Sequence, residues 1–600
     1  MRTLSFLISA ACGFAATSSQ QPPQFLLPDD VTPISHTADL TLDPAADSFT
    51  GSMRIEIQLK RATRLVWLNA RDLEIKRAST TFHGKTSKAT TKLHLNEFVG
   101  LELKSAIGPG NATIDIDYSA PLSSTAKSGP YRRQTAADWY AFTVFTPIDA
   151  RRAFPCFDEP RFKTGWQLSI RVKPGDKAFT NSPSISEQSQ PDGGTTFRFA
   201  RTQLIPSEVV AFAVGPFDIY NAGTAGQRST PIRVLTPKGR KEDGAAAAEA
   251  TNHVLPKLEE YAGIPYPWDK LDHIALPETA FGAVENPGLI TYMSRSLLLP
   301  PSATASQIQG LRGLEAHELA HQWFGNLVTQ STWDDVWLSE GFATWFSSEI
   351  MDLDESPERA HLKLEARRTR IMDADDSPRT HPVRQPKLNR EQMTSVYDRF
   401  PYEKGAAILL TLEGWLGSDT MRTGLRQYLK DHANANATSS DLAAALSKAS
   451  GKNVGPVLDS MLDNTGVPVI EPRIDCEKHA LVIEQAKPQS IPICWRTNTG
   501  ESDCSVLNPS NPRLQSPDRK GGVPSHQIPL KSCPAWVIWN TGGTGYYRTH
   551  WTQLPPLKEL TAAERLTLAR DLKSFPTQGS QELLQALQED KEPEVAAAAK

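Results

Sequence analysis

The sequence lacks any uninterrupted apolar run of about 18 residues, so no part of it is expected to span a membrane. It also lacks an excess of basic charge: lysine and arginine total 64, aspartate and glutamate total 68, and the formal net charge is −4. That balance gives no electrostatic basis for binding nucleic acid. Hydrophobic residues make up 39% and charged residues 22%, which excludes an intrinsically disordered chain. At 600 residues, what remains is a large globular protein of several domains.

Cysteine is scarce, with six residues in the whole chain. No two of them have the C-x-x-C spacing, which argues against a cysteine-based zinc site. Four of the six lie close together near the C-terminal end, where they allow three pairings. We favour a bond across a short hairpin and a second bond joining the ends of one module, namely Cys494–Cys504 and Cys476–Cys533.

The first 18 residues have the features of a secretory signal peptide. Arg2 is positively charged, residues 4–16 form a short apolar stretch, and small residues occur where cleavage is expected. The chain is therefore predicted to be exported, to a periplasm or outside the cell, with no integral membrane segment after removal of residues 1–18. Two alternatives are a frayed apolar N-terminus and a lipoprotein attached through Cys12, for which Ser9 is a poor match.

Hydrophobic periodicity changes twice along the rest of the chain. Residues 48–218 alternate apolar and polar side chains, which predicts half-buried antiparallel strands. After about residue 240 the spacing becomes helical, and after Gly466 strand patterns return. At Thr561 a capping box with Glu564 begins further helices. In the middle region we expect helices over residues 245–261, 307–324, 340–351, 403–416, 420–431 and 441–449.

The most specific motif is His317-Glu318-Leu319-Ala320-His321, within one of these helices. Residues four apart on a helix lie on one face about 5–6 Å apart, so the two imidazoles can bind the same metal ion. Glu318 lies between them, where its carboxylate can reach a water on that metal. This pattern is typical of zinc hydrolases, but five residues are few enough to match by chance.

A zinc site of this kind needs a third protein ligand and an open fourth position. Glu340 follows in the segment Trp337-Leu338-Ser339-Glu340-Gly341, and the chain after His321 can turn back to present it. Without the histidines, Glu340 would be expected to be a solvated or helix-capping carboxylate. The predicted ligands of one Zn²⁺ per chain are therefore His317, His321 and Glu340.

With these residues the sequence resembles the gluzincin zinc aminopeptidases, the group of aminopeptidase N and leukotriene hydrolase. The spacing from the histidine motif to Glu340 matches that family, and the segment Gly282-Ala283-Val284-Glu285-Asn286 resembles its exopeptidase motif. Residues 401–405 resemble the segment of its catalytic tyrosine, here Tyr402. The resemblance extends from about residue 30 to residue 600, and the layout is closest to aminopeptidase N.

The resemblance implies a multidomain α+β fold. Its parts would be an N-terminal antiparallel β saddle, a thermolysin-like α/β zinc catalytic domain, a small β-sandwich and the start of a C-terminal helical domain. After a signal peptide at residues 1–18, we place these parts at residues 19–218, 219–465, 466–555 and 556–600. The last of them is short for such a domain and is expected to be incomplete.

The resemblance also implies a zinc-dependent aminopeptidase that acts on peptides with a free N-terminus. Glu318 would be the general base and acid, and Tyr402 would donate a hydrogen bond to the oxyanion. Glu285 would pair with the α-ammonium of the substrate. The chain around Glu285 would lie beside the substrate like an edge strand, and it comprises Gly282, Ala283, Val284 and Asn286.

Two positions depart from the family pattern. Thr146 stands where the family has a Glu or Gln that binds the amine, and because a hydroxyl lacks a full charge we expect weaker N-terminal anchoring and a raised KM. Val284 replaces a methionine that lines the first-residue pocket, which predicts a roomier pocket. By analogy Cys156 is expected to be a buried structural thiol. Asn326 and either Asp334 or Asp335 are candidates for orienting the zinc ligands, with helix-capping or surface roles as the alternative.

Two other functions are considered. A bifunctional aminopeptidase and epoxide hydrolase is favoured by residues 401–405, which are close to the leukotriene hydrolase branch, but the β module after Gly466 favours the multidomain aminopeptidases. A catalytically silent, zinc-bearing peptide-binding protein is the non-enzymatic alternative. It is disfavoured because both Glu318 and Tyr402 are present.

Overall fold

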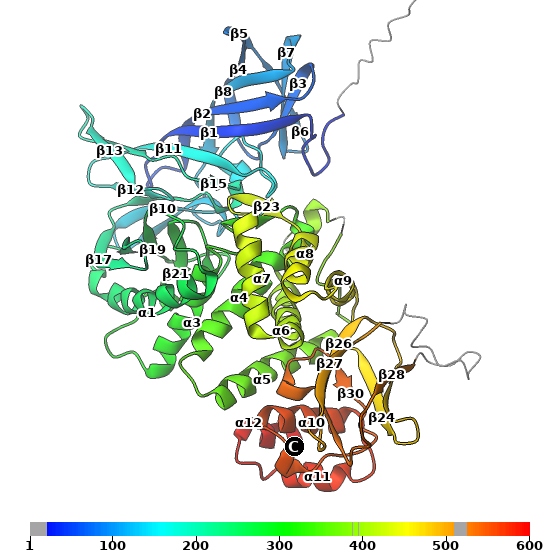
Figure 1. Ribbon diagram of the computed structural model, residues 1–600. Helices are drawn as coiled ribbons and strands as arrows, with labels where there is room; N and C mark the ends of the chain where they lie inside the picture. The colour runs from blue at the N-terminus through cyan, green and yellow to red at the C-terminus, as the bar shows by residue number, and fades with distance from the viewer. Residues whose placement is uncertain (1–20, 387, 394, 509–524) are drawn as a thin grey trace, which may run out of the picture.

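The computed structural model describes residues 21–386, 388–393, 395–508 and 525–600. The expected signal peptide and Cys12 lie outside these residues. The molecule is elongated: N-terminal sheets occupy one end, helices the middle, and a second β region with the last helices the other end (Figure 1). Within the described ranges, no helix combines the length and apolar character needed to cross a bilayer.

The N-terminal region consists of strands joined into three sheets. Its strands are β1 (Val31–Thr41), β2 (Ser48–Leu59), β3 (Thr63–Asn69), β4 (Glu74–Phe82), β5 (Lys85–Lys88), β6 (Thr90–His94), β7 (Phe98–Ile107), β8 (Gly110–Pro121), β9 (Gly129–Thr135), β10 (Asp138–Val144), β11 (Thr164–Val172), β12 (Lys177–Thr180), β13 (Ser184–Ser189), β14 (Thr195–Phe199), β15 (Leu204–Ile205) and β16 (Phe212–Gly215).

The largest N-terminal sheet has the order β13-β14-β11-β1-β2-β8-β4-β5, with β15 paired to β11. Smaller sheets follow the orders β12-β16-β10-β9 and β3-β7-β6. Along β2 every second residue is buried, as the alternation of Met53, Ile55 and Ile57 with polar residues predicts. The pairing is antiparallel except that β1 runs parallel to β11, which the sequence pattern did not indicate.

The middle region contains a mixed sheet covered by helices. Its strands are β17 (Asp218–Ala225), β18 (Thr230–Thr236), β19 (Leu271–Leu276), β20 (Ala283–Val284) and β21 (Leu289–Met293), with the short pair β22 (Val328–Gln330) and β23 (Ala435–Ala437) beside them. The sheet order is β17-β18-β19-β21-β20. The central pairs are parallel and the outer pairs antiparallel, so β20 is an edge strand.

The helices of the middle region include the expected ones, with shifted ends. They are α1 (Ala245–Ala262), α2 (Ser294–Leu297), α3 (Ala305–Ala320), α4 (Trp337–Asp352), α5 (Pro357–Asp375), α6 (Gly405–Leu416), α7 (Ser418–Asp431), α8 (Ser439–Ser450) and α9 (Gly455–Asp463). The helix expected over residues 307–324 ends at Ala320, because the chain then turns through Gly325 at φ +120°. Helices α2, α5 and α9 were not predicted.

The C-terminal region contains two small sheets and then continues as helices. Its strands are β24 (Val469–Asp475), β25 (Ala480–Gln485), β26 (Ile491–Thr497), β27 (Ser502–Leu507), β28 (Ser525–Pro529), β29 (Val537–Trp539) and β30 (Arg548–Thr549). The sheet orders are β28-β25-β24-β30 and β27-β26-β29. The helices are α10 (Ala562–Ser574), α11 (Ser580–Leu587) and α12 (Pro593–Ala599).

Both favoured disulfides are present, Cys476–Cys533 and Cys494–Cys504. Cys494 faces Cys504 directly in the β26–β27 hairpin, as expected for a bond across a short turn. The capping box that begins α10 is also confirmed, with Thr561 and Glu564 each bonded to the other's backbone. Cys156 is buried, with no disulfide partner in the part of the chain that the structure describes.

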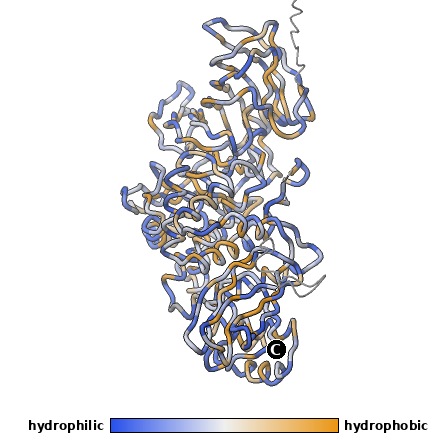
Figure 2. Tube along the Cα trace, turned by 45° about the vertical axis from the view of Figure 1, so that its right-hand side comes forward, coloured by the Kyte–Doolittle hydropathy of each residue, from blue (hydrophilic) through white to orange (hydrophobic). Residues whose placement is uncertain are grey.

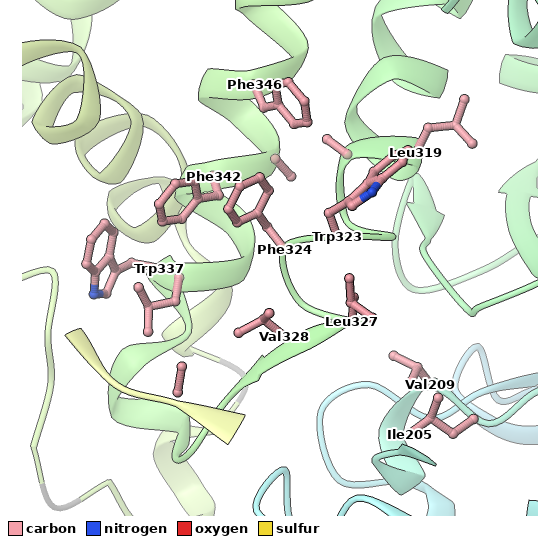
Figure 3. Packing of buried hydrophobic residues seen from close by; sticks show 14 of the residues in the cluster. Ile205, Val209, Leu319, Trp323, Phe324, Leu327, Val328, Trp337, Phe342 and Phe346 are labelled. Atoms are coloured by element: carbon pink, nitrogen blue, oxygen red, sulfur yellow. The ribbon is translucent and has the colours of Figure 1, made fainter. Parts of the chain in front are cut away.

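The interior is a continuous hydrophobic cluster that runs through all these regions. Figure 2 shows hydrophobic stretches in orange through the body of the molecule and hydrophilic stretches in blue along its outer loops. Between α3 and α4 the packing is aromatic: the rings of Phe324 and Phe342 stack with centroids 4.3 Å apart, and Phe346 lies beside them (Figure 3). This packing fixes the position of α4 against the end of α3.

Helices α4 and α6 approach each other at two glycines. A Cβ on Gly341 would lie 2.9 Å from the Pro401 carbonyl oxygen and 3.0 Å from the Gly405 Cα. Helices can approach so closely only where side chains are absent. This contact places the π-helical turn Phe400–Lys404, which carries Tyr402, directly against the first turn of α4.

Gly341→Ala is expected to destabilise the protein although alanine favours helix by about 0.5–1 kcal/mol over glycine. Overpacking costs about 1–3 kcal/mol, so the thermal midpoint should fall by about 2–6 °C in calorimetry. The matched control is Gly310→Ala in α3, where a Cβ would meet no described atom within 4 Å. That control should raise the midpoint slightly; a rise for Gly341→Ala too would contradict the close-packing argument.

Candidate metal centre and substrate site

Helix α3 presents the histidine motif at its C-terminal end. The helix begins with a capping box between Thr304 and Gln307 and ends at Ala320, so His317 and Glu318 lie in its last turn and His321 is the residue that caps it. His321 still has helical backbone angles. The Nε2 atoms of His317 and His321 are therefore 3.2 Å apart and face the same point.

Glu340 joins the two imidazoles from the first turn of α4. Its Oε2 lies 3.6 Å from His317 Nε2 and 3.3 Å from His321 Nε2. Two atoms bound to one zinc ion in tetrahedral geometry are about 3.3–3.4 Å apart, so all three spacings fit a shared ion. Glu340 is 5% exposed, and its Oε2 accepts no hydrogen bond from any described residue. A buried carboxylate oxygen in that state requires a cation, and two imidazoles with one carboxylate suit Zn²⁺.

The other side of the His321 ring is held by polar atoms. Its Nδ1 lies 3.0 Å from Ser339 Oγ and 3.2 Å from the Phe324 carbonyl oxygen. These acceptors place the ring proton on Nδ1 and leave Nε2 free to bind a metal. The sequence did not reveal Ser339 in this role, because only the turn at Gly325 brings residues 324 and 339 to the same imidazole.

The candidates named for orienting the zinc ligands have other partners. Asn326 Nδ2 donates to the Glu285 carbonyl oxygen at 2.9 Å, and Gln322 Nε2 donates to the same oxygen at 2.9 Å. Asp335 accepts a hydrogen bond from the Ser439 hydroxyl, away from the histidines. Asn326 therefore fixes the chain beside the metal centre rather than a metal ligand.

The exopeptidase-like segment lies along the sheet edge next to the histidines. Ala283–Val284 forms the edge strand β20, and Glu285 Oε1 lies 4.0 Å from His321 Nδ1. A Cβ on Gly282 would meet open space, so an extended chain can approach β20 there. Asn286 is buried, with its Nδ2 3.4 Å from the Thr291 hydroxyl.

Val284 does not face this open edge. Its side chain is 2% exposed and packs in a buried cluster with Leu276 and Leu289. Since side chains alternate along a strand, Ala283 and Glu285 point to the opposite face from Val284. The Val284 side chain is therefore not exposed at the edge where we expected it to line the first-residue pocket.

Carboxylates dominate the charge of the site. Burial raises the pKa of Glu318 well above its usual range and also raises that of Glu285, although the nearby His321 acts in the opposite direction. Burial would raise the pKa of Glu340 as well, but His321 and His317 lower it below its usual range. Such a group of buried acids is stabilised by cations, whether a metal ion or an ammonium.

Tyr402 lies over the metal centre, whereas Tyr397 packs to one side. The Tyr402 ring is nearly parallel to the His317 ring, at 12° and 6.0 Å between centroids. Burial and the charge of Glu340 raise the pKa of Tyr402, so its hydroxyl stays protonated and can donate. Tyr397 packs against Phe281 at 6.0 Å and against the cluster that contains Trp333.

Thr146 does not offer a free hydroxyl to the site. It is buried, and its Oγ1 donates to the Glu208 carbonyl oxygen at 3.3 Å. Glu208 itself lies close enough to Glu285 and Glu340 for their charges to raise its pKa, a placement that the sequence did not reveal. A signal existed: Glu208 is an isolated acid within the apolar segment Ile205-Pro206-Ser207-Glu208-Val209-Val210-Ala211-Phe212.

Comparison with known proteins agrees with this geometry. Over 568 residues the chain is 30% identical to aminopeptidase M1-C of Oryza sativa subsp. japonica, covering 92% of this chain and 63% of the relative. It is 32% identical over 483 residues to aminopeptidase M1 of Arabidopsis thaliana, covering 77% and 53%. It is 33% identical over 462 residues to glutamyl aminopeptidase of Bos taurus, covering 74% and 48%. The chain thus spans about half to two thirds of the length of these relatives.

Family models match two separate parts of the chain. Residues 32–209 match the peptidase M1 N-terminal domain, and residues 246–461 match the peptidase family M1 domain, which contains the histidine motif and Glu340. Together with the fold and the converging ligand atoms, these matches show that the chain belongs to peptidase family M1, a gluzincin family of zinc-dependent peptidases.

Proposed function

We propose that this chain is a zinc-dependent aminopeptidase that hydrolyses the N-terminal peptide bond of peptides with a free α-amino group. The observation that carries the proposal is the convergence of three potential ligand atoms: Glu340 Oε2 lies 3.6 Å from His317 Nε2 and 3.3 Å from His321 Nε2. The aminopeptidases among its relatives support the same reaction class.

In this proposal His317, His321 and Glu340 hold one Zn²⁺. When bound, zinc lowers the pKa of water and polarises the scissile carbonyl. Glu318 accepts the proton of the attacking water and then delivers it to the leaving amine, which couples both steps through one carboxylate. Glu318 is suited to this because it follows His317 in the last turn of α3 and lies within the same carboxylate and imidazole group as Glu285 and His321.

The remaining groups position the substrate. The free edge of β20 pairs with the substrate backbone, and Glu285 accepts hydrogen bonds from its α-ammonium. Tyr402 donates to the oxyanion as it develops, an interaction that is strongest in the transition state. Because the α-ammonium is bound at a fixed place beside the metal centre, the first peptide bond is the one that is cleaved, and the enzyme is an exopeptidase.

The test compares one peptide in two forms, free and N-acetylated, incubated with zinc-loaded protein and followed by mass spectrometry. Stepwise loss of residues from the free form alone is expected, because acetylation leaves the half-buried Glu285 carboxylate unpaired. Cleavage of both forms would contradict the exopeptidase assignment. Cleavage of neither would contradict the enzymatic one and favour a peptide-binding protein.

Tyr402→Phe should lower kcat by about 10²–10³-fold with little change in KM, because the lost hydrogen bond is made in the transition state. Bound zinc, measured by atomic emission, should be unchanged. Tyr397→Phe is the matched control, since it removes the same hydroxyl from a tyrosine that packs beside the site; its kcat should change by less than about threefold. Equal losses in both variants would assign the effect to packing.

A further inference from the structure

Glu208 is a buried carboxylate without a counter-charge. It lies in the 3₁₀ turn Ser207–Val209 between β15 and β16, and it is 6% exposed. Its Oε2 accepts no hydrogen bond, and no basic side chain of the described residues forms an ion pair with it. Burial and the negative charges of Glu285, Asp158 and Glu340 raise its pKa to about 8. A cation that enters the site would favour the ionised form of this carboxyl and would be attracted to it.

The turn that carries Glu208 is held firmly. Ser207 Oγ donates to Asp158 Oδ1 at 2.6 Å, and Asn181 Nδ2 donates to the Val209 carbonyl oxygen at 2.9 Å. Ile205 and Val209 belong to the same buried cluster as Leu327, in the loop that follows His321 (Figure 3). The same Asn181 Nδ2 also donates to the Pro287 carbonyl oxygen at 2.9 Å, so the turn that carries Glu208 is tied to the segment that follows Glu285.

The cation that we expect Glu208 to bind is not the metal ion. The groups of described residues that can hold a metal are His317, His321 and Glu340, and Glu285, Glu318 and His321; Glu208 belongs to neither. An ammonium fits better, because it carries one positive charge and three donors that carboxylates from different segments can share. Glu285 already offers such an acceptor beside β20.

We propose that Glu208 is a specificity-determining residue that binds the free α-ammonium of the substrate together with Glu285. This rests on the proposed aminopeptidase function and extends it. The charge that Thr146 cannot supply is then provided by its hydrogen-bonded neighbour, so N-terminal anchoring is not weakened as the sequence alone predicts. Adding a carboxylate at position 146 while keeping Glu208 would place like charges together.

The experiment measures binding rather than turnover. Zinc-loaded protein is titrated by calorimetry with 1-amino-3-methylbutylphosphonic acid and with 3-methylbutylphosphonic acid, which lacks the amine. The wild type should prefer the amine-bearing probe. Glu208→Gln should reduce that preference by about 10- to 100-fold, the range expected for losing a hydrogen bond to a charged group, while binding the amine-free probe as before.

A relocation variant serves as the matched control. Thr146→Glu combined with Glu208→Gln moves the carboxylate to the neighbouring position and should restore part of the preference. Full preference in Glu208→Gln would overturn the proposal. So would equal weakening of both probes together with a lower thermal midpoint, since glutamine keeps the size of a buried carboxyl that has no ion-pair partner and should leave the midpoint unchanged or higher.

The measurements distinguish failure of the proposed aminopeptidase function from failure of the proposed role of Glu208. If the wild type cleaves no peptide yet prefers the amine-bearing probe, and Glu208→Gln loses that preference, then the aminopeptidase assignment is wrong and the role of Glu208 in amine binding is supported. If the wild type shows no preference between the probes, both proposals are wrong.

Discussion

Glu318→Gln is expected to lower kcat by about 10²–10⁴-fold, the range for loss of a general base and acid. Glutamine keeps the size of the side chain but cannot accept the proton of the attacking water. The metal ligands His317 and His321 are unchanged, so zinc content should be that of the wild type. KM should change little, because Glu318 acts on the attacking water and not on the bound peptide.

The matched control for this variant is Glu315→Gln on the same helix. Glu315 is fully buried, accepts a hydrogen bond from the Thr251 hydroxyl at 2.8 Å, and has a pKa raised by burial, so a neutral amide closely imitates it. Its kcat should stay within about threefold of the wild type. Retention of more than a tenth of kcat by Glu318→Gln would mean that another group moves the proton.

The metal ligands could be predicted from the sequence because their geometry is local. Helical periodicity alone places His317 and His321 on one face, and Glu340 lies in the first turn of the next long helix. Family resemblance then added Glu285 and Tyr402. The resemblance also implied an edge strand beside the substrate, and β20 lies at the edge of its sheet, paired with β21.

What the sequence did not reveal depends on contacts between distant segments. Ser339 reaches His321 only because Gly325 turns the chain, and Glu208 meets the site only because the N-terminal sheets pack onto the middle region. Helix α5 has a largely polar sequence, and it is fixed by packing against α10 from the far end of the chain. The burial of the Val284 side chain is a further example, since the face of a two-residue strand cannot be read from its own sequence.

The second large effect is expected on stability, and it concerns the buried ion network of Arg151, Asp158 and Glu97. Arg151 is 1% exposed; its Nε lies 2.8 Å from Asp158 Oδ2 and its Nη1 3.0 Å from Glu97 Oε2. Glu97 also pairs with Arg71 and Arg390, whereas Arg151 is the basic partner of Asp158 in the described chain. Removing Arg151 therefore leaves Asp158 as a buried carboxylate without an ion-pair partner.

Arg151→Met is accordingly expected to reduce stability by about 3–5 kcal/mol, seen as a lower midpoint for the N-terminal region in urea unfolding. The neighbouring Arg152 provides the control: it is 20% exposed, with its carboxylate partners 3.7 Å and 4.0 Å away, and Arg152→Met should cost less than about 1 kcal/mol. Similar losses for both variants would show that arginine packing, not charge pairing, stabilises this region.

Adding Asp158→Asn to Arg151→Met separates the stranded charge from the lost contacts. The double variant should be more stable than Arg151→Met alone, because no unpaired carboxylate remains at position 158. Asp158 also holds Ser207, which precedes Glu208, so the same charge that stabilises the N-terminal region sets the position of the proposed amine anchor. Arg151→Met should therefore weaken the preference for the amine-bearing phosphonate as well as stability, and an unchanged preference would show that the turn at Glu208 is held without Asp158.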